Sequence, residues 1–104
     1  MDRSCIVVLC FDLPSKTAAQ KRSYRRFRAF LLARGYHPLQ KSIYFKLLHY
    51  RSSLNAEVSA VKAGGPKEGD VAVLPLSVRN FSNMMSICGK EIDFSFYLDD
   101  FLII

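Results

Sequence analysis

Residues 4–12, SCIVVLCFD, constrain the fold more than any other stretch of the sequence. Seven apolar residues follow one another and end at a single carboxylate, Asp12, with Pro14 two positions further on. A short, apolar and β-rich run that stops before a proline predicts a buried strand. A buried strand needs packing on both faces of its sheet, so the chain is expected to form a layered α+β domain.

The next stretch, residues 17–34, predicts an amphipathic helix. It contains no glycine or proline, and Gly35 follows it as the expected C-terminal cap. Ser15 or Thr17 can cap its N-terminus. The apolar residues recur every three or four positions, which predicts one buried stripe. This stripe comprises Tyr24, Phe27, Phe30 and Leu31.

The middle of the chain predicts further strand structure and a second helix. Residues 39–48, LQKSIYFKLL, form either one kinked strand or two short strands that meet near Lys41 and Ser42. Residues 52–63 predict a second helix with Leu54, Val58 and Val61 facing inward. A loop with three glycines follows, AGGPKEGD.

The last third of the chain predicts strands at both of its ends. Residues 70–77 read as a strand, in which Pro75 suits an edge position. The segment RNFSNMMSI predicts a helical turn that leads into a short strand near Ile87, and a further strand is expected after Gly89.

This order of elements predicts a ferredoxin-like βαββαβ sandwich with an extra C-terminal strand. Both helices would cover one face of an antiparallel sheet, so the other face needs a second cover. We therefore expect a homodimer. The whole chain, 1–104, is expected to be one domain, with a core over 1–89 and a C-terminal strand and tail, 90–104, that docks on the dimer or another partner.

The charge of the chain predicts a polyanionic partner. Fifteen lysines and arginines face nine acids, giving a net charge of +6, and residues 13–56 contain no acid. At about 100° per residue, the cations of the first helix occupy an arc that does not overlap its apolar stripe. They would hold the phosphates of duplex DNA without reading bases. The predicted set is Lys21, Arg22, Arg25, Arg26 and Arg28, with Lys16 at the N-terminal edge.

Asp12 has two interpretations. It can cap the following helix, or it can bind a divalent cation, because Mg²⁺ takes one or two carboxylates with phosphate oxygens and water. Two Asp12 residues across a dimer axis would make such a site, and any catalysis would rest on them. The other acids are expected in a loop or in the tail. The six acids meant are Glu68, Asp70, Glu91, Asp93, Asp99 and Asp100; Asp2 and Glu57 complete the nine.

Several classes of protein are not favoured by the sequence. No apolar run approaches the roughly 18 residues of a membrane span, and the start lacks a secretion signal, so a soluble, cytoplasmic protein is expected. The three cysteines are odd in number and form no CxxC pair, which predicts small buried apolar residues. No arrangement of Ser, His and Asp or of Cys and His supports nucleophilic catalysis.

Four segments together resemble a known family. VVLCFDLP, YRRFRAFLLARGY, LQKSIYFKL and FSNMMSICG, spread over residues 5–89, are similar to the small CRISPR adaptation subunit, the Cas-two family. The resemblance implies a ferredoxin-like homodimer in which a C-terminal strand adds to the partner's sheet. It also implies a role in spacer acquisition, where the dimer bridges two dimers of the integrase subunit and supports captured DNA.

The resemblance assigns the residues as well. The family's metal-binding aspartate falls on Asp12, and its DNA-contacting surface falls on the first helix. Some members are described as metal-dependent ribonucleases or deoxyribonucleases, so the adaptor hypothesis stands beside a second one, a Mg²⁺-dependent endonuclease. A third reading, a ferredoxin-like RNA-binding module, lacks the aromatic motif of such modules.

Overall fold

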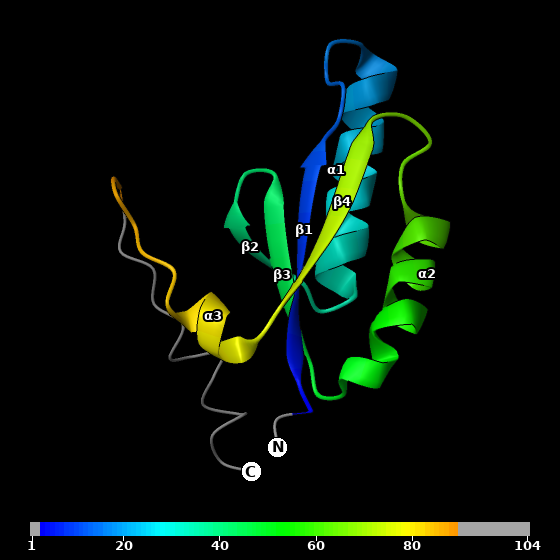
Figure 1. The fold of residues 1–104 in the computed structure, drawn as a ribbon. Coiled ribbons are helices and arrows are strands. Elements are labelled where there is room, and N and C mark those ends of the chain that lie inside the picture. The colour runs from blue at the N-terminus through cyan, green and yellow to red at the C-terminus, as the bar shows by residue number, and fades with distance from the viewer. Residues whose placement is uncertain (1–2, 90–104) are drawn as a thin grey trace.

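The computed structural model describes residues 3–89 and shows a four-stranded sheet with three helices (Figure 1). Its elements alternate along the chain much as the sequence predicts. In chain order they are β1 (Cys5–Asp12), α1 (Ala18–Ala33), β2 (His37–Gln40), β3 (Ile43–Leu48), the short 3₁₀ turn η1 (Arg51–Ser53), α2 (Leu54–Gly64), β4 (Asp70–Leu76) and α3 (Val78–Ser82).

The sheet has the strand order β2-β3-β1-β4, and every pairing is antiparallel. This topology is consistent with a ferredoxin-like fold. Residues 39–48 contain the end of β2 and the whole of β3, joined by a turn over Lys41 and Ser42. The two-strand alternative is therefore correct. Pro75 lies in β4, an edge strand, where a missing N–H donor is tolerated.

Helices α1 and α2 cover one face of the sheet, as predicted (Figure 1). Leu9 and Phe11 of β1 pack there against Phe27 and Leu31 of α1, and Phe27 lies edge-on to Phe11 with ring centroids 5.3 Å apart. The predicted stripe is fully buried only at Phe27 and Leu31. Phe30 is half-buried because it lies at the helix margin, over Gly64 of α2.

Both ends of α1 carry the caps that the sequence predicts. Thr17 accepts a hydrogen bond from the backbone N–H of Gln20, and the Gln20 side chain accepts one from the backbone of Thr17 in return. At the other end, Gly35 has a φ of +94°, and the N–H of Tyr36 donates to the carbonyl of Leu31. This ending directs Tyr36 back into the core, where it is 2% exposed.

The other face of the sheet is covered in part by this chain itself. Val78 and Phe81 of α3 pack on Ile6, Val8 and Phe45, an arrangement that the sequence did not predict. Next to them, Leu74 of β4 is 49% exposed. The second cover is therefore incomplete within the part of the chain that the structure describes.

The predicted strand near Ile87 is wrong. Residues 84–89 form no strand, because Ile87 is fully exposed with no strand to pair with among residues 3–89, and Gly89 turns the chain with a φ of +93°. Cys88 is also exposed, against the expected burial of the cysteines, whereas Cys5 is buried. The predicted C-terminal strand and tail, 90–104, lie outside the described residues. No helix within residues 3–89 is long and apolar enough to cross a membrane.

Candidate nucleic-acid interface and carboxylate pair

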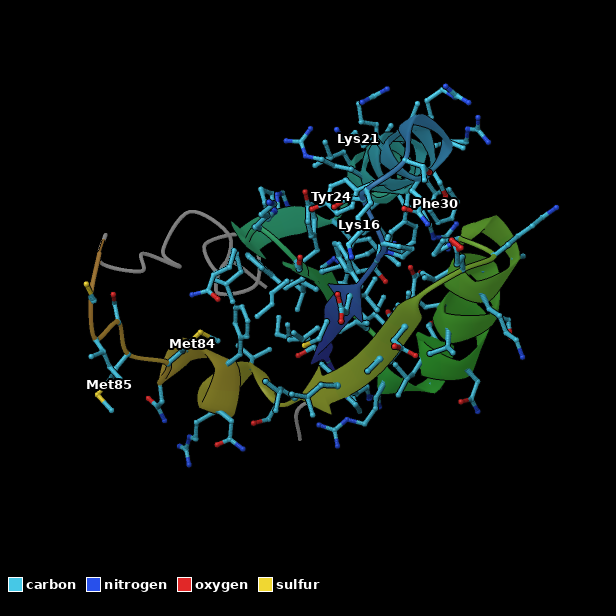
Figure 2. All side chains as sticks on the ribbon, turned by 90° about the horizontal axis from the view of Figure 1, so that it is seen from above. Lys16, Lys21, Tyr24, Phe30, Met84 and Met85 are labelled. Carbon is cyan, nitrogen blue, oxygen red and sulfur yellow. The ribbon has the colours of Figure 1, made fainter. Side chains whose placement is uncertain are left out.

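The cations of α1 lie on its outer face, opposite the buried stripe. Figure 2 shows Lys21 directed away from the sheet, while Phe30 and Tyr24 lie on the side of the helix nearer to it. All five predicted helix cations are exposed, and none of them forms an ion pair with a described residue. We call Lys21, Arg22, Arg25, Arg26 and Arg28 the α1 cation face.

Two contacts hold this face in a fixed relation to the sheet. The Arg28 Nε donates a hydrogen bond of 3.0 Å to the hydroxyl of Tyr44, a buried residue of β3. The Tyr24 hydroxyl donates to the carbonyl of Lys41 at 3.1 Å, which brings the β2–β3 turn against α1. Lys41 is exposed there and adds a cation beside the face, which sequence reasoning missed because the two residues meet only in the folded chain.

Lys16 precedes the first turn of α1 and is exposed, as predicted for the edge of the face. Its backbone N–H donates to the side-chain oxygen of Gln20 at 3.0 Å. The amide of Gln20 in turn donates to Glu68 at 3.3 Å, which ties the start of α1 to the loop before β4. This loop and the helix start therefore lie together at one end of the sheet.

Asp12 does not cap α1, because Thr17 does so. Instead it ends β1 directly opposite Asp70, the first residue of β4. Asp70 is therefore the first residue of the strand predicted over residues 70–77, and it does not lie in the preceding loop. Directly opposed residues of an antiparallel pair point to the same face, with Cβ atoms about 4.5–5.5 Å apart. Two like charges held in this way destabilise the pair unless a cation compensates for them.

Gly69 is the residue that permits this approach. It has a φ of +98°, and a Cβ at this position would lie 2.8 Å from the carbonyl oxygen of Asp12 and 2.7 Å from the Leu13 side chain. The loop can therefore enter β4 close against the end of β1. Both carboxylates are exposed, and neither forms an ion pair with a described residue.

This pair fits the donor set of a hard divalent cation, which takes one or two carboxylates and completes its shell with water or phosphate oxygens. No group of three or more His, Cys, Asp or Glu side chains lies together in the described part of the chain. Any such ion would therefore keep most of its coordination positions for ligands from outside the protomer.

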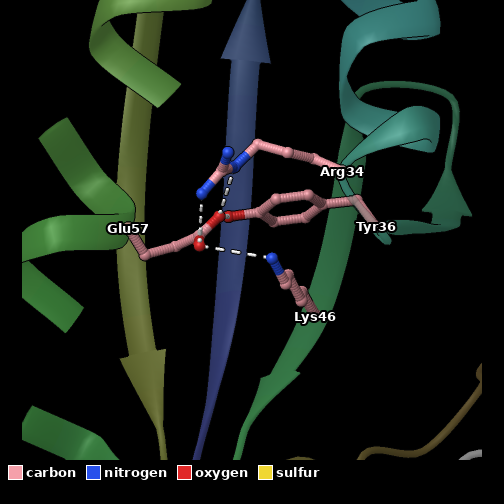
Figure 3. A network of polar contacts seen from close by, with 4 residues as sticks. All are labelled: Arg34, Tyr36, Lys46 and Glu57. Atoms are coloured by element: carbon pink, nitrogen blue, oxygen red, sulfur yellow. Dashed lines mark hydrogen bonds and ion pairs between the residues drawn. The ribbon is translucent and has the colours of Figure 1, made fainter. Parts of the chain in front are cut away.

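Glu57, which the sequence analysis did not single out, has a buried carboxylate. Glu57 of α2 is 6% exposed and accepts hydrogen bonds from Arg34 at 2.9 and 3.0 Å, from Tyr36 at 2.9 Å and from Lys46 at 3.2 Å (Figure 3). The signal was its spacing, three residues after Leu54 and four before Val61, on the inward face of the helix.

The network keeps Glu57 ionised. Burial raises the pKa of its carboxyl, but the hydrogen bonds from Arg34, Tyr36 and Lys46 outweigh burial and lower the pKa to about 2. Burial and the bond to Glu57 raise the pKa of the Tyr36 phenol. The network joins the connection between α1 and β2, which carries Arg34 and Tyr36, to β3 and α2, so it holds the helical layer on the sheet.

A comparison with known protein families decides the identity. The profile of the family described as CRISPR associated protein Cas2 matches residues 5–84. The chain belongs to the Cas2 family. The resemblance inferred from the four segments is thereby confirmed, and the matched region contains Asp12, Asp70 and all of α1.

Curated relatives support the assignment over most of their length. A Streptococcus mutans serotype c protein is 36% identical over 85 residues, covering 82% of this chain and 79% of the relative. An Acidovorax ebreus protein is 34% identical over 80% of this chain and 81% of its own, and a Treponema denticola protein is 32% identical over 82% and 84%. Each bears the name CRISPR-associated endoribonuclease Cas2.

Proposed function

We propose that this Cas2 protein is a homodimeric DNA-binding adaptor for CRISPR spacer acquisition. The α1 cation face would hold captured duplex DNA, and the dimer would bridge subunits of the CRISPR integrase. The observation that carries the proposal is the exposed, acid-free row of five cations on a helix whose opposite side is core. Such a row neutralises backbone phosphates without regard to sequence.

The half-covered second face of the sheet supports the proposed homodimer. Leu74 lies on β4, an edge strand, and stays about half exposed beside the residues that α3 covers. An apolar strand edge of this kind is suited to a second copy of the chain. In the dimer, Asp12 of each protomer would face the shared surface, because Asp12 alternates with Phe11, which lies on the helical side.

Asp12→Ala is expected to leave spacer acquisition unchanged. Bridging and phosphate contact depend on shape and charge, and bond cleavage is no part of them. The measurement is the number of new spacers in cells that carry the integrase subunit and a repeat array, with thermal melting of the purified variant alongside. A variant that melts normally, dimerises and yet adds no spacers would contradict the adaptor proposal.

A second candidate function is a metal-dependent endonuclease that cleaves RNA or DNA. It is favoured by Asp70 standing opposite Asp12 and by the endoribonuclease name of the relatives. Asp12 and Asp70 would hold Mg²⁺, and Asp12 of the second protomer would complete the site. The bound ion would supply a water of lowered pKa and neutralise phosphate charge.

Asp70→Asn is expected to raise the melting temperature without metal and to abolish the further rise on adding Mg²⁺. The substitution removes one of two opposed charges, which relieves repulsion and also removes a ligand. In the unmodified protein, Mg²⁺ at 100 times its Kd would stabilise the fold by about 2.7 kcal/mol. Glu68→Gln is the matched control, a nearby exposed acid that is hydrogen-bonded to Gln20. Persistence of the Mg²⁺ effect in Asp70→Asn would exclude Asp70 as a ligand.

A further inference from the structure

A small basic and aromatic surface lies apart from α1, at the point where β3 ends. Tyr50 is 58% exposed and stands between His49 and Arg51, which are exposed as well. The backbone N–H of Arg51 donates to the carbonyl of Arg3, so an exposed arginine from the start of the chain lies beside them. We call Arg3, His49, Tyr50 and Arg51 the Tyr50 patch.

The acidic side chains of residues 3–89 lie away from the Tyr50 patch. Asp12 and Asp70 stand at the far end of the sheet, because Cys5, at the near end of β1, pairs with Leu48 just before the patch. Eight strand residues separate these ends by roughly 20 Å. Figure 1 shows the same separation, with β1 and α2 beginning at one end and β4 at the other.

The remaining acids of residues 3–89 do not offset the patch either. Glu68 lies in the loop that leads into β4, two residues before Asp70, and Glu57 is buried and ion-paired with Arg34 and Lys46. The patch also precedes the N-terminus of the eleven-residue α2, whose end carries a partial positive charge. The arginines and the N-terminus of α2 therefore both attract a negatively charged ligand.

Within residues 3–89, Tyr50 belongs to neither of the two hydrophobic clusters. Among residues 3–89 it is the one phenylalanine or tyrosine whose side chain is mostly exposed. Exposed aromatic rings flanked by arginines bind unpaired nucleotides, because the ring stacks on a base while the cations hold the adjacent phosphates. A fully paired duplex offers no base face for such stacking except at its ends.

We propose that the Tyr50 patch binds unpaired nucleotides of single-stranded DNA or RNA by stacking a base on Tyr50. Arg3 and Arg51 contact the phosphates on either side of that base. This site is distinct in place and in chemistry from the duplex-binding face proposed for α1. It gives the protein one surface for paired and another for unpaired nucleic acid.

The test is fluorescence anisotropy of the full-length protein with three labelled probes of equal length, namely oligothymidylate, oligouridylate and a blunt duplex. Tyr50→Ala is expected to weaken binding of the single strands about tenfold and to leave duplex binding unchanged. Tyr50→Phe retains the ring and is expected to retain the affinity. The two single strands show whether DNA, RNA or both are the ligand.

The matched control is Met85→Ala, which shortens another exposed apolar side chain, 85% exposed and outside α1. It is expected to change none of the three affinities. Unchanged single-strand binding in Tyr50→Ala overturns the proposal, as does an equal loss for the duplex or an equal loss in Tyr50→Phe. A change in the mass of the protein in solution on Tyr50→Ala also overturns it, because the patch would then be a protein contact. Failure of the α1 proposal would appear separately, as unchanged duplex affinity when Arg22, Arg25 and Arg26 are replaced.

Discussion

Glu57→Ala is expected to lower the free energy of unfolding by about 3–5 kcal/mol, the usual cost of removing one partner from a buried ion pair. The variant leaves the Tyr36 hydroxyl buried without its acceptor and leaves Arg34 and Lys46 without their counter-ion. Urea unfolding measures the change. A loss below about 1 kcal/mol would show that the network does not hold α2 on the sheet.

The same carboxylate makes stability depend on pH in a definite direction. Its pKa is about 2 in the folded protein and 4.5 ordinarily, so its contribution is complete above about pH 5 and is lost as the pH falls towards 2. The shift corresponds to about 3 kcal/mol. Glu57→Ala should therefore flatten the acid side of the stability profile. The exposed Glu68→Ala serves as control and should change stability by less than about 0.5 kcal/mol.

Replacing Arg22, Arg25 and Arg26 together with alanine is expected to weaken duplex binding by about 10² to 10³ at 0.1 M salt. Each phosphate contact makes log K fall by about 0.9 for each tenfold rise in salt concentration. Between about 1 M and 0.1 M salt, one contact therefore raises the duplex affinity nearly tenfold, and three contacts raise it by about 10² to 10³. All three side chains are exposed, so the fold should be unaffected. Anisotropy with a labelled blunt duplex measures the loss.

A control must separate this effect from the change in overall charge. Lys62 of α2 and Arg79 of α3 are exposed cations away from the α1 face. Their joint replacement with alanine should weaken duplex binding by less than tenfold. An equal loss per charge in both variants would mean that net charge, and not the α1 face, binds the duplex.

The elements that the sequence predicted well are those whose signals are local. The apolar run before Asp12 and the cap formed by Thr17 depend on neighbours within a few residues, and both lie where they were expected. The cations of α1 follow from helical periodicity alone, since any helix with a buried stripe at Phe27 and Leu31 must expose Arg22 and its neighbours.

The parts that could not be predicted depend on pairing between distant residues. Asp70 joins Asp12 through a strand register fixed by β1 and β4, and no local pattern encodes that register. Glu57 reads as one more surface acid until Arg34, Tyr36 and Lys46 converge on it. The cover that α3 gives to the second face likewise arises from the packing of Phe81 on Phe45.

The central claim is that the α1 cation face holds the phosphates of duplex DNA. Its most direct test is the salt dependence of duplex affinity, compared between the unmodified protein and the variant with Arg22, Arg25 and Arg26 replaced. Our account predicts that the slope of log K against log salt becomes shallower by about three for each protomer on the duplex. A slope unchanged by the triple replacement would show that these arginines form a solvated surface and contact no phosphate.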